Sequence, residues 1–226
     1  MGDIKDHTRV NDILLGPLER PALQWLAAHM PAWASPDLMT VTGIIGALVI
    51  ALGYGLSRFH PAFLWLSTLG FIINWIGDSL DGTLARYRHI ERPKYGFYID
   101  HVTDVLTEII IIVSLGVSPY VTFSLACMCC ITYIAMSVLV YVRMNVMGEF
   151  KISYGKLGPT EVRLLAILLN TAMYFGGVYK FNLTLGSITA PISPYDLYVV
   201  AISLLLVYFF AETSIKQSIA LRKLGE

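Results

Sequence analysis

The sequence Asp78-Ser-Leu-Asp-Gly-Thr-Leu-Ala-Arg86 directly follows the apolar run Pro61–Gly77. No helix breaker other than glycine separates the two, so we predict one helix that runs through the apolar residues and on through Arg86. Asp78 and Asp81 are three residues apart and would share one face of that helix, which Ala85 continues. The pattern therefore predicts a helix that carries acids at one end of a long apolar stretch.

The composition of the whole chain agrees with this pattern. Hydrophobic residues make up 56% of its 226 residues and charged residues only 14%, and the mean hydropathy is +0.64. Soluble domains contain roughly 25% charged residues. We therefore predict an integral membrane protein. The formal net charge is zero, and we expect no nucleic-acid partner.

Six stretches have the length of about 20 residues that a membrane-spanning helix needs. They are Met39–Ser57, Pro61–Gly77, Phe97–Val117, Val121–Val142, Val162–Tyr179 and Leu197–Ile215. The second continues through Arg86, as argued above. The predicted fold class is thus an all-α integral membrane protein with six transmembrane helices.

The N-terminal segment has a different character. No apolar core follows its charged start until past Arg9 and Arg20, so we expect no cleavable signal. Leucines and Trp25, interrupted by Pro17 and Pro21, indicate a juxtamembrane amphipathic helix on the membrane surface. We predict three regions: a cytoplasmic juxtamembrane segment (1–36), a six-helix catalytic domain (37–217) and a cytoplasmic tail (218–226).

The basic residues predict how the helices cross the membrane. Fourteen of the 16 Lys and Arg residues lie in the N-terminal arm, the second and fourth connections and the tail. Only Arg58 and Lys180 remain for the other side. By the positive-inside rule, both termini and the acidic motif face the cytoplasm. The size of the chain suggests a prokaryotic cytoplasmic membrane.

A second pair of acids follows the first at a short interval. Asp100 and Asp104 are four residues apart and share a face at the start of the third predicted span. A turn between the two helices would bring four carboxylates together, and oxygen ligands at this density suit Mg²⁺ or Mn²⁺. Arg86 could bind phosphate oxygens. The alternative is a set of helix-end acids that pair with basic residues at the headgroup level.

These residues resemble the CDP-alcohol phosphotransferase family. Its pattern D-x-x-D-G-x-x-A-R, a spacer and G-x-x-x-D-x-x-x-D is met by Asp78, Asp81, Gly82, Ala85, Arg86, Gly96, Asp100 and Asp104. The nine-residue spacer, Tyr87–Tyr95, is slightly longer than the family pattern. Pro36-Asp37 stands where the family often has Pro-Asn.

The resemblance implies transfer of a substituted phosphate from a CDP-linked donor to the hydroxyl of an alcohol or lipid, with release of CMP. It also implies two divalent ions, Mg²⁺ or Mn²⁺, and a homodimer among membrane lipids. The family's metal ligands correspond to Asp78, Asp81, Asp100 and Asp104, and Asp104 would also act as the base. The implied nucleotide- and phosphate-binding residues are Gly82, Ala85, Arg86, Gly96 and Asp37.

The sequence leaves two branches of the family open. Arg143 and Arg163 lie where members with phosphorylated acceptors hold the acceptor phosphate, although both could be ordinary cytoplasmic anchors. Asp100-His101 and Gly158-Pro-Thr-Glu161 resemble the choline and ethanolamine branch, in which diacylglycerol is the acceptor. His101 could relay a proton to Asp104, and Glu161 could bind an amine or cap a helix.

Two other classes of membrane protein use intramembrane acids. A prenyltransferase holds a pyrophosphate through Mg²⁺, but its two acidic motifs normally lie far apart. A cation transporter would carry a second acid cluster in an inverted repeat, and the C-terminal half contains none. The phosphotransferase is therefore the first hypothesis, and these two are the alternatives.

Overall fold

The computed structural model describes residues 8–10, 14–147, 149–151, 158–186 and 188–224 of the 226. Seven helices dominate it: α1 (Gly16–His29), α2 (Pro36–Leu56), α3 (Phe63–Tyr87), α4 (Pro93–Val117), α5 (Phe123–Met147), α6 (Pro159–Gly176) and α7 (Pro194–Leu224). Two short two-stranded sheets pair β1 (Thr8–Val10) with β2 (Glu149–Lys151), and β3 (Phe181–Leu185) with β4 (Ile188–Ile192). The described protein is therefore predominantly α-helical, as predicted.

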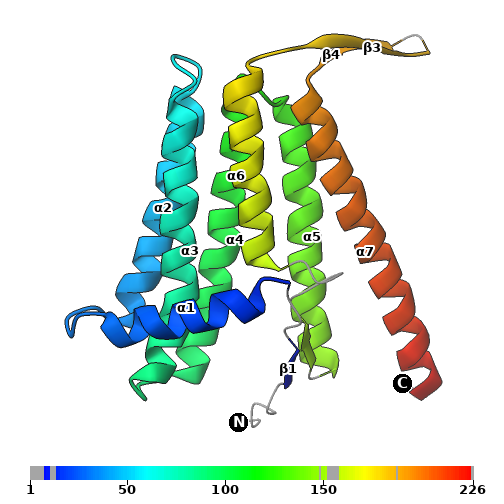
Figure 1. The fold of residues 1–226 in the computed structure, drawn as a ribbon. Helices are drawn as coiled ribbons and strands as arrows, with labels where there is room; N and C mark the ends of the chain where they lie inside the picture. The colour runs from blue at the N-terminus through cyan, green and yellow to red at the C-terminus, as the bar shows by residue number, and fades with distance from the viewer. Residues whose placement is uncertain (1–7, 11–13, 148, 152–157, 187, 225–226) are drawn as a thin grey trace.

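The long helices α2 to α7 run roughly side by side, and α1 lies across one end of the bundle (Figure 1). Both termini are at this end, and the β3–β4 hairpin is at the other. Each of the six predicted spans falls on one of the helices α2 to α7. Four of them, α2, α3, α5 and α7, are long and apolar enough to cross a membrane. Acids interrupt the apolar sequence of α4, and charged and polar residues interrupt that of α6.

Close contact between α2 and α3 determines where the acidic motif lies. A Cβ added to Gly46 of α2 would be 2.4 Å from the backbone N of Asn74 in α3. A Cβ on Gly77 of α3 would be 2.2 Å from the backbone N of Gly43. Small residues let transmembrane helices approach in this way. The glycines therefore hold the C-terminal half of α3 directly against α2.

We expect Gly46→Ala to destabilise the protein, because the added methyl group would meet the backbone of α3 and force the helices apart. Overpacking of this kind costs about 1–3 kcal/mol of the free energy of unfolding. The measurement is denaturant unfolding in mixed micelles. Gly55→Ala in the same helix is the matched control, because a Cβ at Gly55 has no atom within 4 Å. Equal stability of the two variants would contradict this account.

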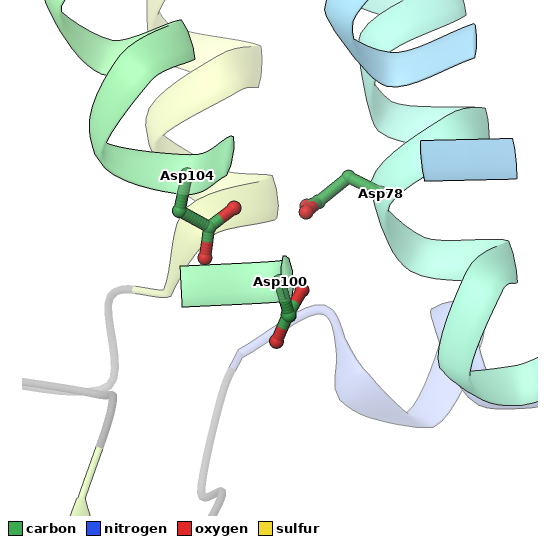
Figure 2. A group of neighbouring side chains, drawn as sticks. All are labelled: Asp78, Asp100 and Asp104. Carbon is green, nitrogen blue, oxygen red and sulfur yellow. The ribbon is translucent and has the colours of Figure 1, made fainter. Parts of the chain in front are cut away.

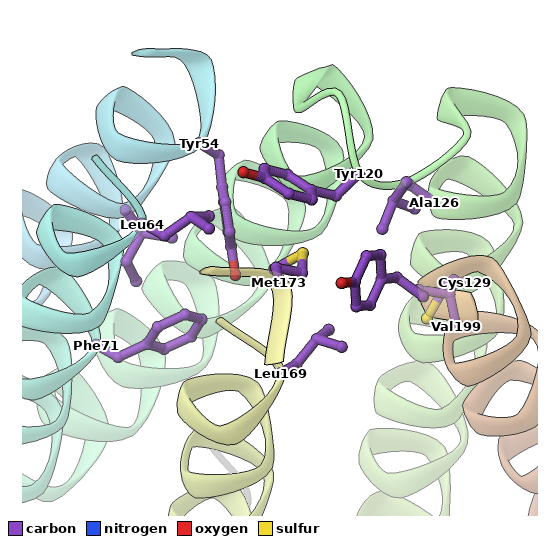
Figure 3. Packing of buried hydrophobic residues seen from close by; sticks show 12 residues of the cluster. Tyr54, Leu64, Phe71, Tyr120, Ala126, Cys129, Leu169, Met173 and Val199 are labelled. Atoms are coloured by element: carbon purple, nitrogen blue, oxygen red, sulfur yellow. The ribbon is translucent and has the colours of Figure 1, made fainter. Parts of the chain in front are cut away.

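A buried apolar core joins the helices toward the end of the bundle that carries the β3–β4 hairpin. Figure 3 shows Tyr54, Phe71, Met173 and Val199 of α2, α3, α6 and α7 converging there. The Tyr54 hydroxyl donates to Oδ1 of Asn170, and this amide donates to Thr68. Because buried polar groups require partners, these bonds also fix the relative positions of the three helices.

The connection between α1 and α2 is tied to the end of α3. Ser35 caps α2 by accepting from the N–H of Leu38 at 3.2 Å. The Arg88 guanidinium, just beyond α3, donates to the carbonyl oxygens of Met30, Pro31 and Ala34. Arg88 therefore satisfies backbone groups that no helix pairs, and it keeps α1 near the acidic end of α3.

Candidate active site

Three of the four motif aspartates converge between α3 and α4. Asp78, Asp100 and Asp104 each offer a carboxylate oxygen, and these three oxygens lie within 4.8 Å of one another. Figure 2 shows Asp78 on α3 facing the two acids of α4. The side chains are partly buried. Three carboxylates this close repel one another unless a cation neutralises them, and oxygen ligands suit Mg²⁺ or Mn²⁺. The donor set therefore fits a divalent ion.

Asp78 also has a protein cation as a partner. Nη2 of Arg163 in α6 donates to Oδ2 of Asp78 at 2.6 Å, and Nε donates to Oδ1 of Asn74 at 2.9 Å. Asn74 is 2% exposed, and its amide nitrogen donates to the carbonyl oxygen of Gly43 in α2. Through this chain of bonds, α2, α3 and α6 together set the position of Asp78.

Asp81 is one turn further along α3 and is held differently. Its Oδ2 accepts from the Thr40 hydroxyl of α2 at 2.9 Å, and its Oδ1 accepts from the N–H of Gly82. Asp81 is outside the group of three close acids, yet it lines the same small cavity as Asp78 and Asp104. The structure thus separates Asp81 from the three close carboxylates, whereas the sequence placed all four together.

We expect Thr40→Val to weaken divalent-ion binding, because it removes the hydroxyl that orients the Asp81 carboxylate with almost no change in shape. Loss of such a supporting bond typically weakens metal binding or activity by about 10-fold. Mn²⁺ titration of the purified protein measures the effect. Thr42→Val is the matched control, since the Thr42 hydroxyl donates to the carbonyl of Leu38 in its own helix. An unchanged Mn²⁺ affinity in Thr40→Val would contradict this role.

A larger cavity of about 150 Å³ opens beside these acids between α2 and α4. Its lining includes Asp37, Thr40 and Tyr95. Arg92 pairs with Asp37, and its guanidinium carbon lies 4.3 Å from the centre of the Tyr95 ring. Because this cavity shares Thr40 and Thr103 with the smaller one, the two cavities adjoin, and the larger one lies beside the acids.

The glycines and the arginine of the motif lie at the same end. A Cβ on Gly82 would be 3.2 Å from Nη1 of Arg86, so the guanidinium folds back over this glycine. Nη2 of Arg86 donates to the Thr83 hydroxyl at 3.3 Å. A Cβ on Gly96 would meet no atom within 4 Å. Arg86 is exposed, as a residue that meets a phosphate from solvent would be.

A comparison of the sequence with known protein families agrees with this geometry. The model of the CDP-alcohol phosphatidyltransferase family matches residues 33–209, which include α2 to α6 and all the acids described above. The chain belongs to the CDP-alcohol phosphatidyltransferase family. The resemblance inferred from the acidic motif is thereby confirmed.

Several curated relatives carry the name cholinephosphotransferase 1. The protein from Gallus gallus is 27% identical over 186 residues, which are 75% of this chain and 53% of that protein. The Homo sapiens protein is 24% identical over 74% of this chain and 44% of its own length. The Mus musculus protein is 26% identical over 79% and 46%. The chain spans about half the length of the curated relatives that it matches.

The two residues that suggested the choline branch, His101 and Glu161, both have structural contacts. His101 packs between Phe97 and Tyr141, with ring centres at 4.0 and 5.0 Å, and its Nδ1 is 3.5 Å from Oδ2 of Asp100. Glu161 is 4% exposed and accepts from the backbone N–H groups of Leu15 and Gly158. Its helix-capping role is therefore present in the structure.

Two residues that hydrogen-bond to the site, Thr40 and Asn74, were not predicted from the sequence. Asn74 is a polar residue within the apolar run that precedes the motif, and this position could have marked it. Thr40 has no such local signal, because its partner Asp81 lies 41 positions away in the sequence. The other basic candidate, Arg143, is a partly buried residue of α5.

Proposed function

We propose that the protein is a membrane CDP-alcohol phosphotransferase of phospholipid synthesis. It transfers the amino alcohol together with its attached phosphate from a CDP-linked donor to the hydroxyl of a diacylglycerol, and it releases CMP. The observation that carries this proposal is the group of Asp78, Asp100 and Asp104 beside the α2–α4 cavity, in a chain that belongs to the family. Family membership supports neither the prenyltransferase nor the transporter.

The site would hold two divalent ions, either Mg²⁺ or Mn²⁺. Their ligands would be Asp78, Asp81, Asp100 and Asp104. When bound, such ions withdraw charge from the pyrophosphate of the donor and stabilise the leaving group. Asp37, Gly82, Ala85, Arg86 and Gly96 would bind the nucleotide and its phosphates. The cavity between α2 and α4 has room beside the acids for part of this donor.

Asp104 is the proposed general base. The acceptor hydroxyl oxygen attacks the phosphorus that carries the alcohol, and its proton passes to the Asp104 carboxylate. The new O–P bond forms as the P–O bond to CMP breaks, and the electron pair leaves with CMP. His101, against Asp100, would orient that neighbouring carboxylate or relay the proton.

The environment of Arg163 favours the amino alcohol branch. Two of its nitrogens are engaged by Asp78 and Asn74, so we assign it to the metal-binding side of the site and not to an acceptor phosphate. The names of the curated relatives point the same way. The alternative is a CDP-diacylglycerol donor with a phosphorylated acceptor, for which Arg143 would be the remaining candidate ligand, with Arg163 released from Asp78.

We also propose the membrane arrangement in which α2 to α7 all cross the bilayer and α1 lies on the cytoplasmic surface. The strand β1 and the C-terminal end of α7 lie at the same end of the bundle, which supports an even number of crossings (Figure 1). Leu14, Leu18 and Trp25 of this N-terminal region are more than 60% exposed, as a membrane-facing surface would be. The following also stay predictions: the division into regions 1–36, 37–217 and 218–226, the cytoplasmic position of the site, the homodimer and the prokaryotic membrane.

The test is CMP release by the full chain, purified into lipid vesicles with Mg²⁺. One arm supplies CDP-choline or CDP-ethanolamine with diacylglycerol, and the other supplies CDP-diacylglycerol with glycerol phosphate or inositol phosphate. Asp104→Asn is the blank. Release in the first arm alone is the expected result. Release only from CDP-diacylglycerol would overturn the branch, and no metal-dependent release from any donor would overturn the proposed activity.

A further inference from the structure

The carboxylate of Glu19 in α1 joins three helices at one point. Its Oε1 accepts from the Thr160 hydroxyl of α6 at 2.7 Å and from the indole Nε1 of Trp75 in α3 at 3.1 Å. The Ser79 hydroxyl of α3 lies 3.5 Å from the same oxygen. The three donors belong to α3 and α6, so this one oxygen ties both helices to α1.

A second tie joins the same ends of α1 and α6. The N–H of Leu15, at the start of α1, donates to Oε1 of Glu161 at 2.7 Å. Oε2 of Glu161 accepts from the N–H of Gly158 at 2.9 Å, which caps α6. The start of α1 and the start of α6 are thus joined by two hydrogen bonds. In one, the backbone of α1 donates to a side chain of α6, and in the other, a side chain of α6 donates to a side chain of α1.

Both helices that Glu19 joins carry residues of the metal site. Ser79 directly follows Asp78 in α3, and Thr160 precedes Arg163 by three residues, less than one turn of α6. Arg163 in turn donates to Asp78 at 2.6 Å. Glu19, Thr160, Arg163, Asp78 and Ser79 therefore form a closed loop of covalent and hydrogen-bonded connections. A shift of α1 would move α3 against α6 at the acids.

We propose that Glu19 is a positioning residue for the divalent-ion site. It touches neither substrate nor ion, and it acts by fixing Arg163 and Asp78 relative to each other through Thr160 and Ser79. The helix α1 then helps to set the geometry of the ion site, in addition to any contact that it makes with the membrane surface. This proposal rests on the proposed function for its link to turnover, but its main test is ion binding without substrate.

The experiment measures Mn²⁺ binding to the full chain in lipid nanodiscs from the electron paramagnetic resonance signal of free Mn²⁺. Glu19→Leu removes the acceptor, and the nearly isosteric Thr160→Val removes one donor. Each is expected to weaken Mn²⁺ binding by about 10-fold, the usual effect of losing an outer support of a metal site. The double variant should bind Mn²⁺ no more weakly than Glu19→Leu alone, because the bond that Thr160→Val removes is one of those that Glu19→Leu already removes.

Conservative variants distinguish a loss of positioning from a general loss of folding. Glu19→Gln keeps a carbonyl acceptor and Thr160→Ser keeps a hydroxyl donor, so both should bind Mn²⁺ nearly as the wild type does. Glu212→Leu is the matched control, because Glu212 pairs with Lys216, four residues further along the same helix α7. A loss of folded protein would lower the number of Mn²⁺ sites, whereas a positioning defect lowers the affinity of each site.

Two outcomes distinguish this proposal from the proposed function. If Thr160→Val is folded and binds Mn²⁺ with wild-type affinity, or if the effects of Glu19→Leu and Thr160→Val add, the positioning role is overturned. If the wild type binds Mn²⁺ and the variants weaken it, but no CDP-linked donor yields CMP, the positioning role holds and the proposed function fails. Thermal unfolding of each variant is measured alongside the Mn²⁺ titration. If Glu19→Leu does not fold, the Mn²⁺ affinity of Thr160→Val alone tests the proposal.

Discussion

Asp78→Asn is expected to abolish Mg²⁺-dependent CMP release and to destabilise the protein as well. The loss of activity follows because Asp78 is the α3 member of the three close acids. The loss of stability follows because Arg163, whose side chain is only 16% exposed, keeps its charge and loses its anionic partner. Such a loss costs about 2 kcal/mol or more of the free energy of unfolding. Activity assays and thermal unfolding of the same preparation measure both effects.

The control for Asp78→Asn is Asp100→Asn, which removes another of the three acids. The Asp100 side chain is more exposed, at 41% against 23% for Asp78, so water can compensate more of the charge that its removal leaves unbalanced. We therefore expect the same loss of CMP release with a smaller loss of stability. Asp78→Asn combined with Arg163→Gln should recover stability without activity. Full activity in Asp78→Asn would contradict the assignment of this residue to the metal site.

Asp104→Asn is expected to lower kcat by about 1,000-fold while the protein still binds its CDP-linked donor. An amide cannot take the proton of the acceptor hydroxyl, and loss of a positioned base typically costs between about 100- and 10,000-fold. Asp78, Asp81 and Asp100 remain to bind the ions and, through them, the pyrophosphate. Single-turnover CMP release measures the chemical step, and equilibrium binding of CDP-choline measures donor affinity separately.

The outcome that would contradict this role is a loss of donor binding equal to the loss of rate, because Asp104 would then act as a metal ligand alone. Glu108→Gln provides the matched control, since Glu108 lies one turn further along α4 and contacts Ser137 of α5 at 3.4 Å. It should retain the chemical step that Asp104→Asn loses. An equal loss in the two variants would mean that the base is not specific to Asp104.

The sequence by itself determined the helical framework and the family. Helix α3 runs through Asp78 and Arg86 as predicted, because the absence of Pro and the helical spacing of the acids are local properties. Asp100 and Asp104 also share a face of α4 for a local reason, the four-residue spacing between them. Length and hydropathy of the apolar stretches were enough to predict a membrane protein, since the bilayer sets both.

Only the tertiary structure decided which charges meet. The spacing predicted that four acids converge, and the packing of the helices gives each its surroundings: Asp78 lies next to the acids of α4 and bonds to Arg163 of α6, while Asp81 bonds to Thr40 of α2. Likewise, nothing near Glu19 in the sequence indicates its bonds to α3 and α6. The physical reason is that helix periodicity determines which residues share a face, whereas the partner of a face depends on how distant helices pack.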